Sequence, residues 1–66
     1  MKLVVNGDQR ELDPAITVAQ LLLLDNEPVN QVLVAVNGVF VPPSRHATTR
    51  FADGDRVEII NPIFGG

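Results

Sequence analysis

The chain has 66 residues, which is room for one domain, and a chain of this size buries only about 60% of the surface that its unfolded form exposes. Apolar residues make up 45% of the sequence and charged residues 20%, which argues against disorder, and no apolar run approaches the roughly 20 residues of a membrane-spanning helix. The net charge of −3 is spread along the chain without a basic cluster, which argues against nucleic acid as a partner.

The N-terminal segment is predicted to form a β-hairpin. An apolar strand over residues 2–6 leads into Asn6-Gly7, a strong signal for a two-residue turn. The second strand covers roughly residues 9–12. It ends at Asp13-Pro14, because proline disfavours the helical conformation in the residue before it.

One substantial helix follows this hairpin. Thr17 and Gln20 have the spacing of a capping box, in which each side chain bonds the backbone N–H of the other residue. The helix should end around Asp25-Asn26, before Pro28. Its apolar face consists of Val18, Leu21, Leu22 and Leu24, and we expect so small a domain to need the whole run 21–24 for its core.

A second hairpin is predicted after the helix. Residues 31–36 are rich in β-branched side chains, and Asn37-Gly38 places a tight turn before a strand over residues 39–41. Pro42-Pro43 then ends the ladder of hydrogen bonds, because proline has no backbone N–H to donate.

The remaining part of the domain is predicted to be a connection and a last strand. Residues 44–49 should be irregular, with at most one short helical turn. Asp53-Gly54-Asp55 marks a turn, and turn chemistry is enough to explain both aspartates. Residues 56–60 form the last strand, whose apolar content suits a central, buried position.

These elements together predict an α+β fold. The order hairpin, helix, hairpin, connection and strand indicates one mixed sheet of about five strands packed on one main helix. A right-handed crossover would place an early strand parallel to the last one.

The six residues after the last strand are the candidate functional site. We expect a domain over residues 1–60 and a flexible arm over residues 61–66, which can reach about 20 Å at roughly 3.3 Å per residue. Gly65 and Gly66 are slim enough for a partner enzyme to close around them. The Gly66 carboxylate is ionised near pH 7 and is a poor electrophile, so it must be activated. An acyl adenylate made with ATP would allow a sulfur nucleophile to displace AMP and leave a thiocarboxylate.

The tail also has a simpler interpretation. A chain ends in two glycines by chance about 0.5% of the time, and frayed termini or cloning scars raise that figure. The two-hairpin pattern and the preceding Ile63-Phe64 favour the functional interpretation. These two apolar residues either fold back onto the sheet or anchor the tail in a partner pocket, and we favour partner binding.

The other candidate residues are assigned to ordinary structural roles. The chain has no cysteine, which removes disulfides and thiol nucleophiles, and a lone His46 makes a metal site improbable. We expect His46 to be polar loop surface, and Phe40 and Phe51 to pack in the core. Three arginines are expected to be solvated surface charges: Arg45, Arg50 and Arg56.

The order of these segments resembles the thiamine-pathway sulfur carrier (ThiS) family of small ubiquitin-like β-grasp proteins. The resemblance covers essentially the whole chain. It is carried by Val4-Val5-Asn6-Gly7, Thr17-Val18-Ala19-Gln20-Leu21-Leu22, Val34-Ala35-Val36-Asn37-Gly38, Val41-Pro42, Asp53-Gly54-Asp55-Arg56-Val57-Glu58-Ile59-Ile60 and Gly65-Gly66.

This resemblance implies a carrier that is acted on by partner enzymes and is not itself an enzyme. An E1-like adenylyltransferase would adenylate Gly66 with ATP and Mg²⁺, which belong to that partner. A cysteine desulfurase or rhodanese-type protein would supply the sulfur as a persulfide, and thiazole synthase would accept it. We expect the chain to bind no cofactor itself, to be cytoplasmic and monomeric when free, and to bind neither nucleic acid nor membranes.

Two departures from the family pattern keep alternatives open. Pro42-Pro43-Ser44-Arg45-His46 stands where the family often has Val-Pro-Arg followed by acidic and aromatic residues, and Phe64 is bulkier than many residues before the diglycine. The small subunit of molybdopterin synthase or another thiocarboxylate carrier is one alternative. A ubiquitin-like modifier, in which Gly66 forms an isopeptide bond to a lysine, is another. An RNA-binding β-grasp module is disfavoured by the acidic balance.

Overall fold

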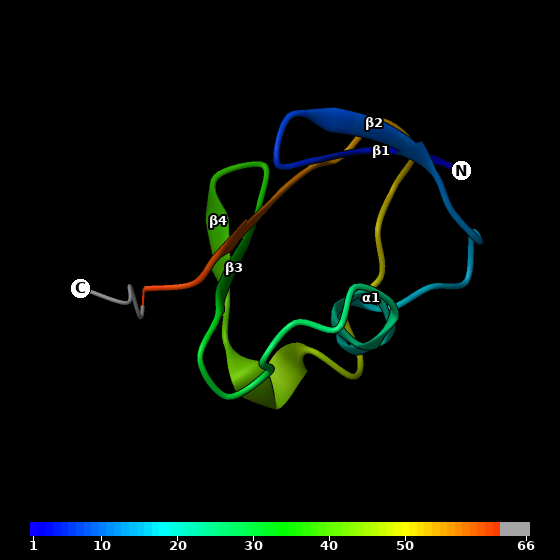
Figure 1. The fold of residues 1–66 in the computed structure, drawn as a ribbon. Coiled ribbons are helices and arrows are strands. Elements are labelled where there is room, and N and C mark those ends of the chain that lie inside the picture. The colour runs from blue at the N-terminus through cyan, green and yellow to red at the C-terminus, as the bar shows by residue number, and fades with distance from the viewer. Residues whose placement is uncertain (63–66) are drawn as a thin grey trace.

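The computed structural model describes residues 1–62 of the chain. This part folds into a five-stranded sheet, one α-helix and a single 3₁₀ turn (Figure 1). The elements in chain order are β1 (Lys2–Val5), β2 (Asp8–Glu11), α1 (Val18–Leu24), β3 (Leu33–Val36), β4 (Val39–Val41), the 3₁₀ turn η1 (Pro43–Arg45) and β5 (Arg56–Ile60).

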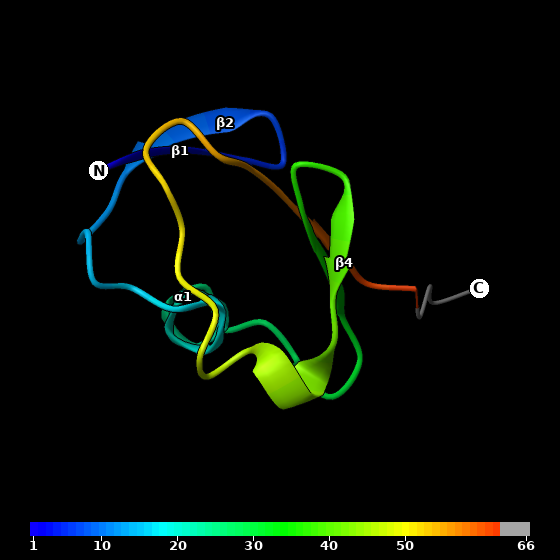
Figure 2. The ribbon, with the colours of Figure 1, turned by 180° about the vertical axis from the view of Figure 1, so that it is seen from behind.

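The sheet is mixed, and its last strand is central. Its strand order is β2-β1-β5-β3-β4, with β5 parallel to β1 and antiparallel to β3. The two hairpins lie on either side of β5, and the sheet curves around α1, as both views show (Figures 1 and 2). The predicted fold class and the central position of the last strand are therefore confirmed.

The two Asn-Gly dipeptides form the hairpin turns as predicted. Asn6 and Gly7 have φ angles of 50° and 85°, and Asn37 and Gly38 have φ angles of 52° and 81°. A type I′ turn requires a positive φ at both central residues, which asparagine and glycine adopt most readily. These turns therefore fix the register of both hairpins.

Helix α1 begins and ends with specific caps. The Thr17 Oγ1 atom accepts from the Gln20 N–H at 3.2 Å, and Gln20 Oε1 accepts from the Thr17 N–H at 2.9 Å, which completes the predicted capping box. At the other end, Asn26 has a φ of 55°, and the Glu27 N–H donates to the Leu22 carbonyl at 2.9 Å. This is the left-handed termination typical of a Schellman motif.

The core lies between α1 and the concave face of the sheet. Twelve apolar side chains are buried there: Leu3, Val5, Ile16, Val18, Leu21, Leu22, Val32, Val34, Val41, Phe51, Val57 and Ile59. Phe51 is in the core as predicted. The prediction that the run 21–24 belongs to the core is wrong for Leu23 and Leu24, which are exposed. A helix of seven residues has only one face on the sheet, and these two residues lie on the other side.

His46 is buried, with only 6% of its surface exposed, so the prediction that it is polar loop surface is wrong. Its Nε2 atom lies 3.0 Å from the Val41 carbonyl oxygen, and its own carbonyl accepts from the Ala19 N–H at 2.8 Å. The turn η1 begins at Pro43, one residue before the connection predicted over residues 44–49. His46, the residue that directly follows this turn, is directed inward. His46 thus joins the end of β4 to the start of α1.

No helix in the described part of the chain is long and apolar enough to cross a membrane.

Candidate functional site

The predicted reactive end of the chain lies beyond the described residues. Ile63, Phe64, Gly65 and Gly66 all fall outside residues 1–62, so the predictions for them are not tested by the structure. The structure does describe the root of this segment, which is strand β5 followed by Asn61 and Pro62. The geometry of the root determines where the last residues begin.

The root is held on both sides by neighbouring strands. On one side, Ile60 pairs with Leu33 and Ile59 pairs with Val34, so β3 supports β5 to its last residue. On the other side, the pairing with β1 reaches only Val57. Beyond that point, the Asn6 side chain replaces the backbone of β1 as the hydrogen-bond partner of β5, because its Oδ1 atom accepts from the Ile59 N–H at 2.8 Å.

The start of β5 is fixed by the second turn. The Arg56 N–H donates to Asn37 Oδ1 at 2.9 Å, and Asn37 Nδ2 donates to Asp55 Oδ1 at 2.9 Å. Asp55 Oδ2 also accepts from the Ala52 N–H at 2.8 Å, which is the turn role expected for this aspartate. Both asparagine side chains were missed as contacts of β5, although the Asn-Gly signals placed them in turns.

The outer face of the sheet, turned away from α1, carries an apolar patch beside the root. The patch consists of Leu33, Phe40 and Ile60, whose exposed fractions are 47%, 55% and 48%. Leu33 lies opposite Ile60, while Phe40 and Glu58 both pair with Ala35. Paired residues share a face of the sheet, so these side chains lie together. The prediction that Phe40 packs in the core is wrong, because Phe40 is exposed on the outer face while the next residue of β4, Val41, is buried.

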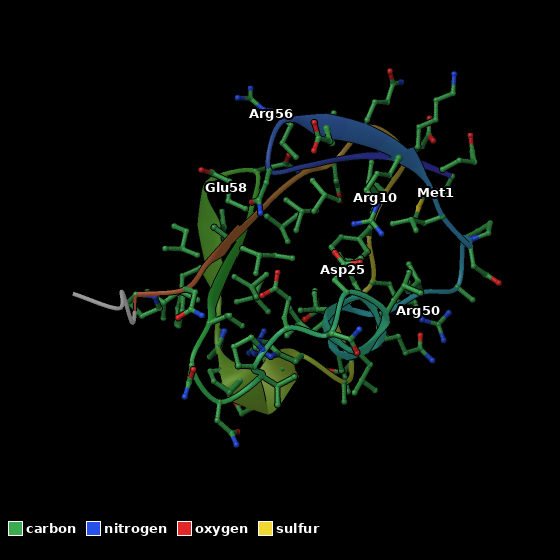
Figure 3. All side chains as sticks on the ribbon, in the orientation of Figure 1. Met1, Arg10, Asp25, Arg50, Arg56 and Glu58 are labelled. Carbon is green, nitrogen blue, oxygen red and sulfur yellow. The ribbon has the colours of Figure 1, made fainter. Side chains whose placement is uncertain are left out.

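Charged side chains border this patch on the same face. Arg56 and Glu58 alternate with the buried Val57 and Ile59 along β5, and Figure 3 shows both pointing away from α1. Arg45, Arg50 and Arg56 are exposed, as expected for solvated charges. The alternation of Arg56 and Glu58 with Val57 and Ile59 along β5 was the signal that could have revealed the outer face, whereas β3 is apolar throughout and shows no such alternation.

A bidentate ion pair lies away from the root. Arg10 on β2 forms a bidentate pair with Asp25 at the end of α1, with nitrogen–oxygen distances of 2.7 and 2.8 Å (Figure 3). The hydrogen bonds from Arg10 hold the pKa of Asp25 below its usual value, against a smaller opposing effect of burial. The same bonds raise the pKa of Arg10. This pair joins the β1–β2 hairpin to the end of α1 and has a structural role.

Within residues 1–62 the structure brings together no group of three or more His, Asp or Glu side chains that could hold a metal ion. His46 has backbone groups as its partners and lies under the sheet, not beside the root. The main feature of the described residues near the root is therefore the partly apolar outer face of the sheet, from which the C-terminal segment starts.

The mixed sheet with its last strand in the centre, curved around one helix, defines the chain as a β-grasp domain. The chain belongs to the ThiS family, whose model matches residues 3–66. Members of this family are carrier proteins of thiamine biosynthesis rather than enzymes.

Known relatives agree with this assignment. The chain is similar to the crystal structure of the thiamine biosynthesis protein ThiS from Geobacter metallireducens, with 33% identity, a TM-score of 0.82 and complete coverage of both chains. It is also similar to a solution NMR structure of a thiamine biosynthesis protein from that organism, with 33% identity and a TM-score of 0.77, covering 100% of this chain and 88% of the other.

A relative of a different size adds a link to a second protein. Over all 66 residues, the chain is 39% identical to a thiazole synthase from Paramagnetospirillum magneticum. The chain spans 20% of the length of that relative. A segment similar to this chain is therefore part of a longer protein named thiazole synthase.

Proposed function

We propose that the chain is a sulfur carrier that delivers sulfur for thiazole formation in thiamine biosynthesis, with the Gly66 carboxylate as its reactive group. The observation that carries the proposal is the ThiS family match, which extends to Gly66. In this proposal, residues 1–60 are the recognition domain, residues 61–66 form the arm, and Ile63 and Phe64 anchor the arm in the partner.

The chemistry takes place in partner enzymes. The Gly66 carboxylate attacks the α-phosphate of ATP in an E1-like adenylyltransferase, and pyrophosphate leaves. The persulfide of a cysteine desulfurase or rhodanese-type protein then attacks the carbonyl carbon and displaces AMP, which leaves an acyl disulfide. A second thiol of the partner proteins cleaves its S–S bond, forms a disulfide with the donor cysteine and releases the thiocarboxylate. The resulting thiocarboxylate is a better nucleophile than the carboxylate, and thiazole synthase takes the sulfur from it.

The apolar patch of Leu33, Phe40 and Ile60 is the docking surface for thiazole synthase in this proposal. Its position supports this role, because an enzyme that encloses the arm must also approach the surface from which the arm starts. The thiazole synthase relative supports the choice of partner, since it contains a segment similar to this chain. Apolar side chains at the centre of such a contact usually supply much of its binding energy.

The proposal is tested by charging the protein in vitro. The chain is incubated with the adenylyltransferase, ATP, Mg²⁺ and a sulfur donor, and its intact mass is measured. We expect the exchange of one oxygen for one sulfur atom, confined to the C-terminal peptide. The starting mass also checks that Gly66 is the free C-terminus, as the proposal requires.

Oxidation of Met1 gives a similar mass change, so a thiol-alkylating reagent is needed as a second measurement. The chain has no cysteine, and the reagent should label only a thiocarboxylate. Isopeptide conjugates to lysine in place of a labelled terminus would support a ubiquitin-like modifier. If the charged chain gave its sulfur to a molybdopterin precursor and not to the thiazole synthase reaction, the small subunit of molybdopterin synthase would be supported.

The slim tail leads to a prediction for Gly65. Gly65→Trp should abolish charging because the side chain blocks entry into a narrow active site, whereas Gly65→Ala should retain part of it. Charging is followed by mass spectrometry, and thermal unfolding shows whether the domain is intact. Normal charging of Gly65→Trp would contradict the proposal that the tail enters a closed site.

A further inference from the structure

Asn6 and Asn37 occupy equivalent places in the two hairpins but hold opposite ends of β5. Both have a positive φ and precede a glycine. Both use the side-chain Oδ1 atom to accept a backbone N–H of β5, from Ile59 at 2.8 Å for Asn6 and from Arg56 at 2.9 Å for Asn37. The strand that leads to the reactive end is therefore fixed by side chains at its start and near its finish.

The Asn6 contact replaces a missing backbone bond. Between β1 and β5, the Val4 N–H donates to the Asp55 carbonyl and the Asn6 N–H donates to the Val57 carbonyl, both at 2.9 Å. In a regular parallel ladder, the next bond would run from the Ile59 N–H to the backbone carbonyl of residue 6. The chain turns away at Asn6, and the Oδ1 atom accepts this bond in place of the carbonyl.

We propose that Asn6 is a positioning residue for the reactive C-terminus, because its side chain keeps the last part of β5 in the sheet. The proposal rests on the sulfur carrier function proposed above. Without this acceptor, Ile59 and Ile60 are held by β3 alone, and the end of the strand can fray. A frayed strand adds residues that must be ordered again when the partner enzyme closes on the arm.

This role makes a specific kinetic prediction. Ordering of the root is required for binding and not for the transfer step, so loss of the Asn6 contact should raise KM and leave kcat unchanged. The expected rise in KM is about fivefold, the factor that corresponds to one typical net hydrogen bond.

Three variants separate this role from a general effect on stability. Asn6→Gly removes the acceptor and still permits a positive φ. Asn6→Asp keeps an oxygen acceptor in the same place and should restore the wild-type values. Asn37→Gly is the matched control, since it removes the equivalent contact at the start of β5 together with the bond to Asp55.

Two measurements are made on each variant. Amide hydrogen exchange should be faster at Ile59 in Asn6→Gly, and faster at Arg56 in Asn37→Gly. Steady-state pyrophosphate release is measured with the adenylyltransferase at increasing carrier concentrations. We expect the fivefold rise in KM for Asn6→Gly and a KM near that of the wild type for Asn6→Asp and Asn37→Gly.

The outcomes distinguish the two proposals. An unchanged KM for Asn6→Gly, or an equal rise for Asn37→Gly, overturns the positioning role of Asn6 and leaves the carrier function standing. Absence of pyrophosphate release with the wild-type chain overturns the carrier function, and the positioning role with it.

Discussion

Asp25 connects the end of α1 to the β1–β2 hairpin. Its bidentate pair with Arg10 is partly shielded, with exposed side-chain fractions of 20% for Asp25 and 31% for Arg10. Pairs at a protein surface usually contribute about 1 kcal/mol or less, and a bidentate arginine lies at the upper end of that range. The contribution is thus small but should be measurable in so small a domain.

The pair predicts a pH dependence of stability. Because the folded-state pKa of Asp25 is lowered, its contribution is present above the unfolded-state pKa and is lost as the pH falls through the folded-state value. Asp25→Asn should therefore be less stable than the wild type by about 1 kcal/mol near neutral pH. The difference should vanish in strong acid. Urea unfolding at both pH values measures it, and a constant difference would contradict this assignment.

His46 is the second residue whose role is defined by contacts distant in sequence. His46→Ala removes the bond to the Val41 carbonyl and leaves a void beside α1, so we expect a loss of about 2 kcal/mol in the free energy of unfolding. Arg45→Ala is the control, because this exposed neighbour should change the free energy by no more than about 0.5 kcal/mol. Chemical denaturation compares the two variants. Equal effects would show that the buried imidazole has no special structural role.

At the level of elements, the outer face of β3, β4 and β5 differs from the exposed side of α1. Both expose large apolar side chains, including Phe40 on β4 and Leu23 on α1, with exposed fractions of 55% and 70%. Only the sheet face borders the strand from which the C-terminal segment starts. Exposure alone therefore does not distinguish the proposed docking surface from the exposed side of α1. The sheet face is favoured by its position beside β5.

This difference gives a matched pair of variants. Phe40→Thr keeps a good strand residue but removes the aromatic ring, and should weaken binding to thiazole synthase about tenfold or more. Leu23→Gln keeps a good helix residue and should bind as the wild type does. Titration calorimetry with thiazole synthase measures both, and thermal unfolding confirms that the folds are intact. Equal weakening by the two changes would rule out the sheet face as the specific contact.

For the molecule as a whole, local signals predicted the elements and their order. The Asn-Gly turns and the capping box at Thr17 and Gln20 were confirmed because the chemistry of each lies within a few neighbouring residues. The last strand was placed centrally from its apolar content and the handedness of crossovers. These are the features that a single sequence specifies most strongly.

The errors concern residues whose surroundings come from distant parts of the chain. Phe40 has an aromatic side chain in a strand, yet the register of β4 turns it to solvent. His46 lies in a loop, yet the turn η1 brings it against α1. The contact of Asn6 with Ile59 spans 53 positions in the chain and has no local signal. The predictions for residues 63–66 fall outside the described part and remain predictions.

The central position of β5 also has a consequence for biosynthesis. Each hairpin can form as it leaves the ribosome, but the bonds that join one hairpin to the other pass through β5, which is synthesised after the other four strands of the sheet. A nascent chain that stops before Arg56 has two separate hairpins and an incompletely covered core, and small isolated hairpins are at best marginally stable in water. Truncated translation products should therefore be good substrates for proteases.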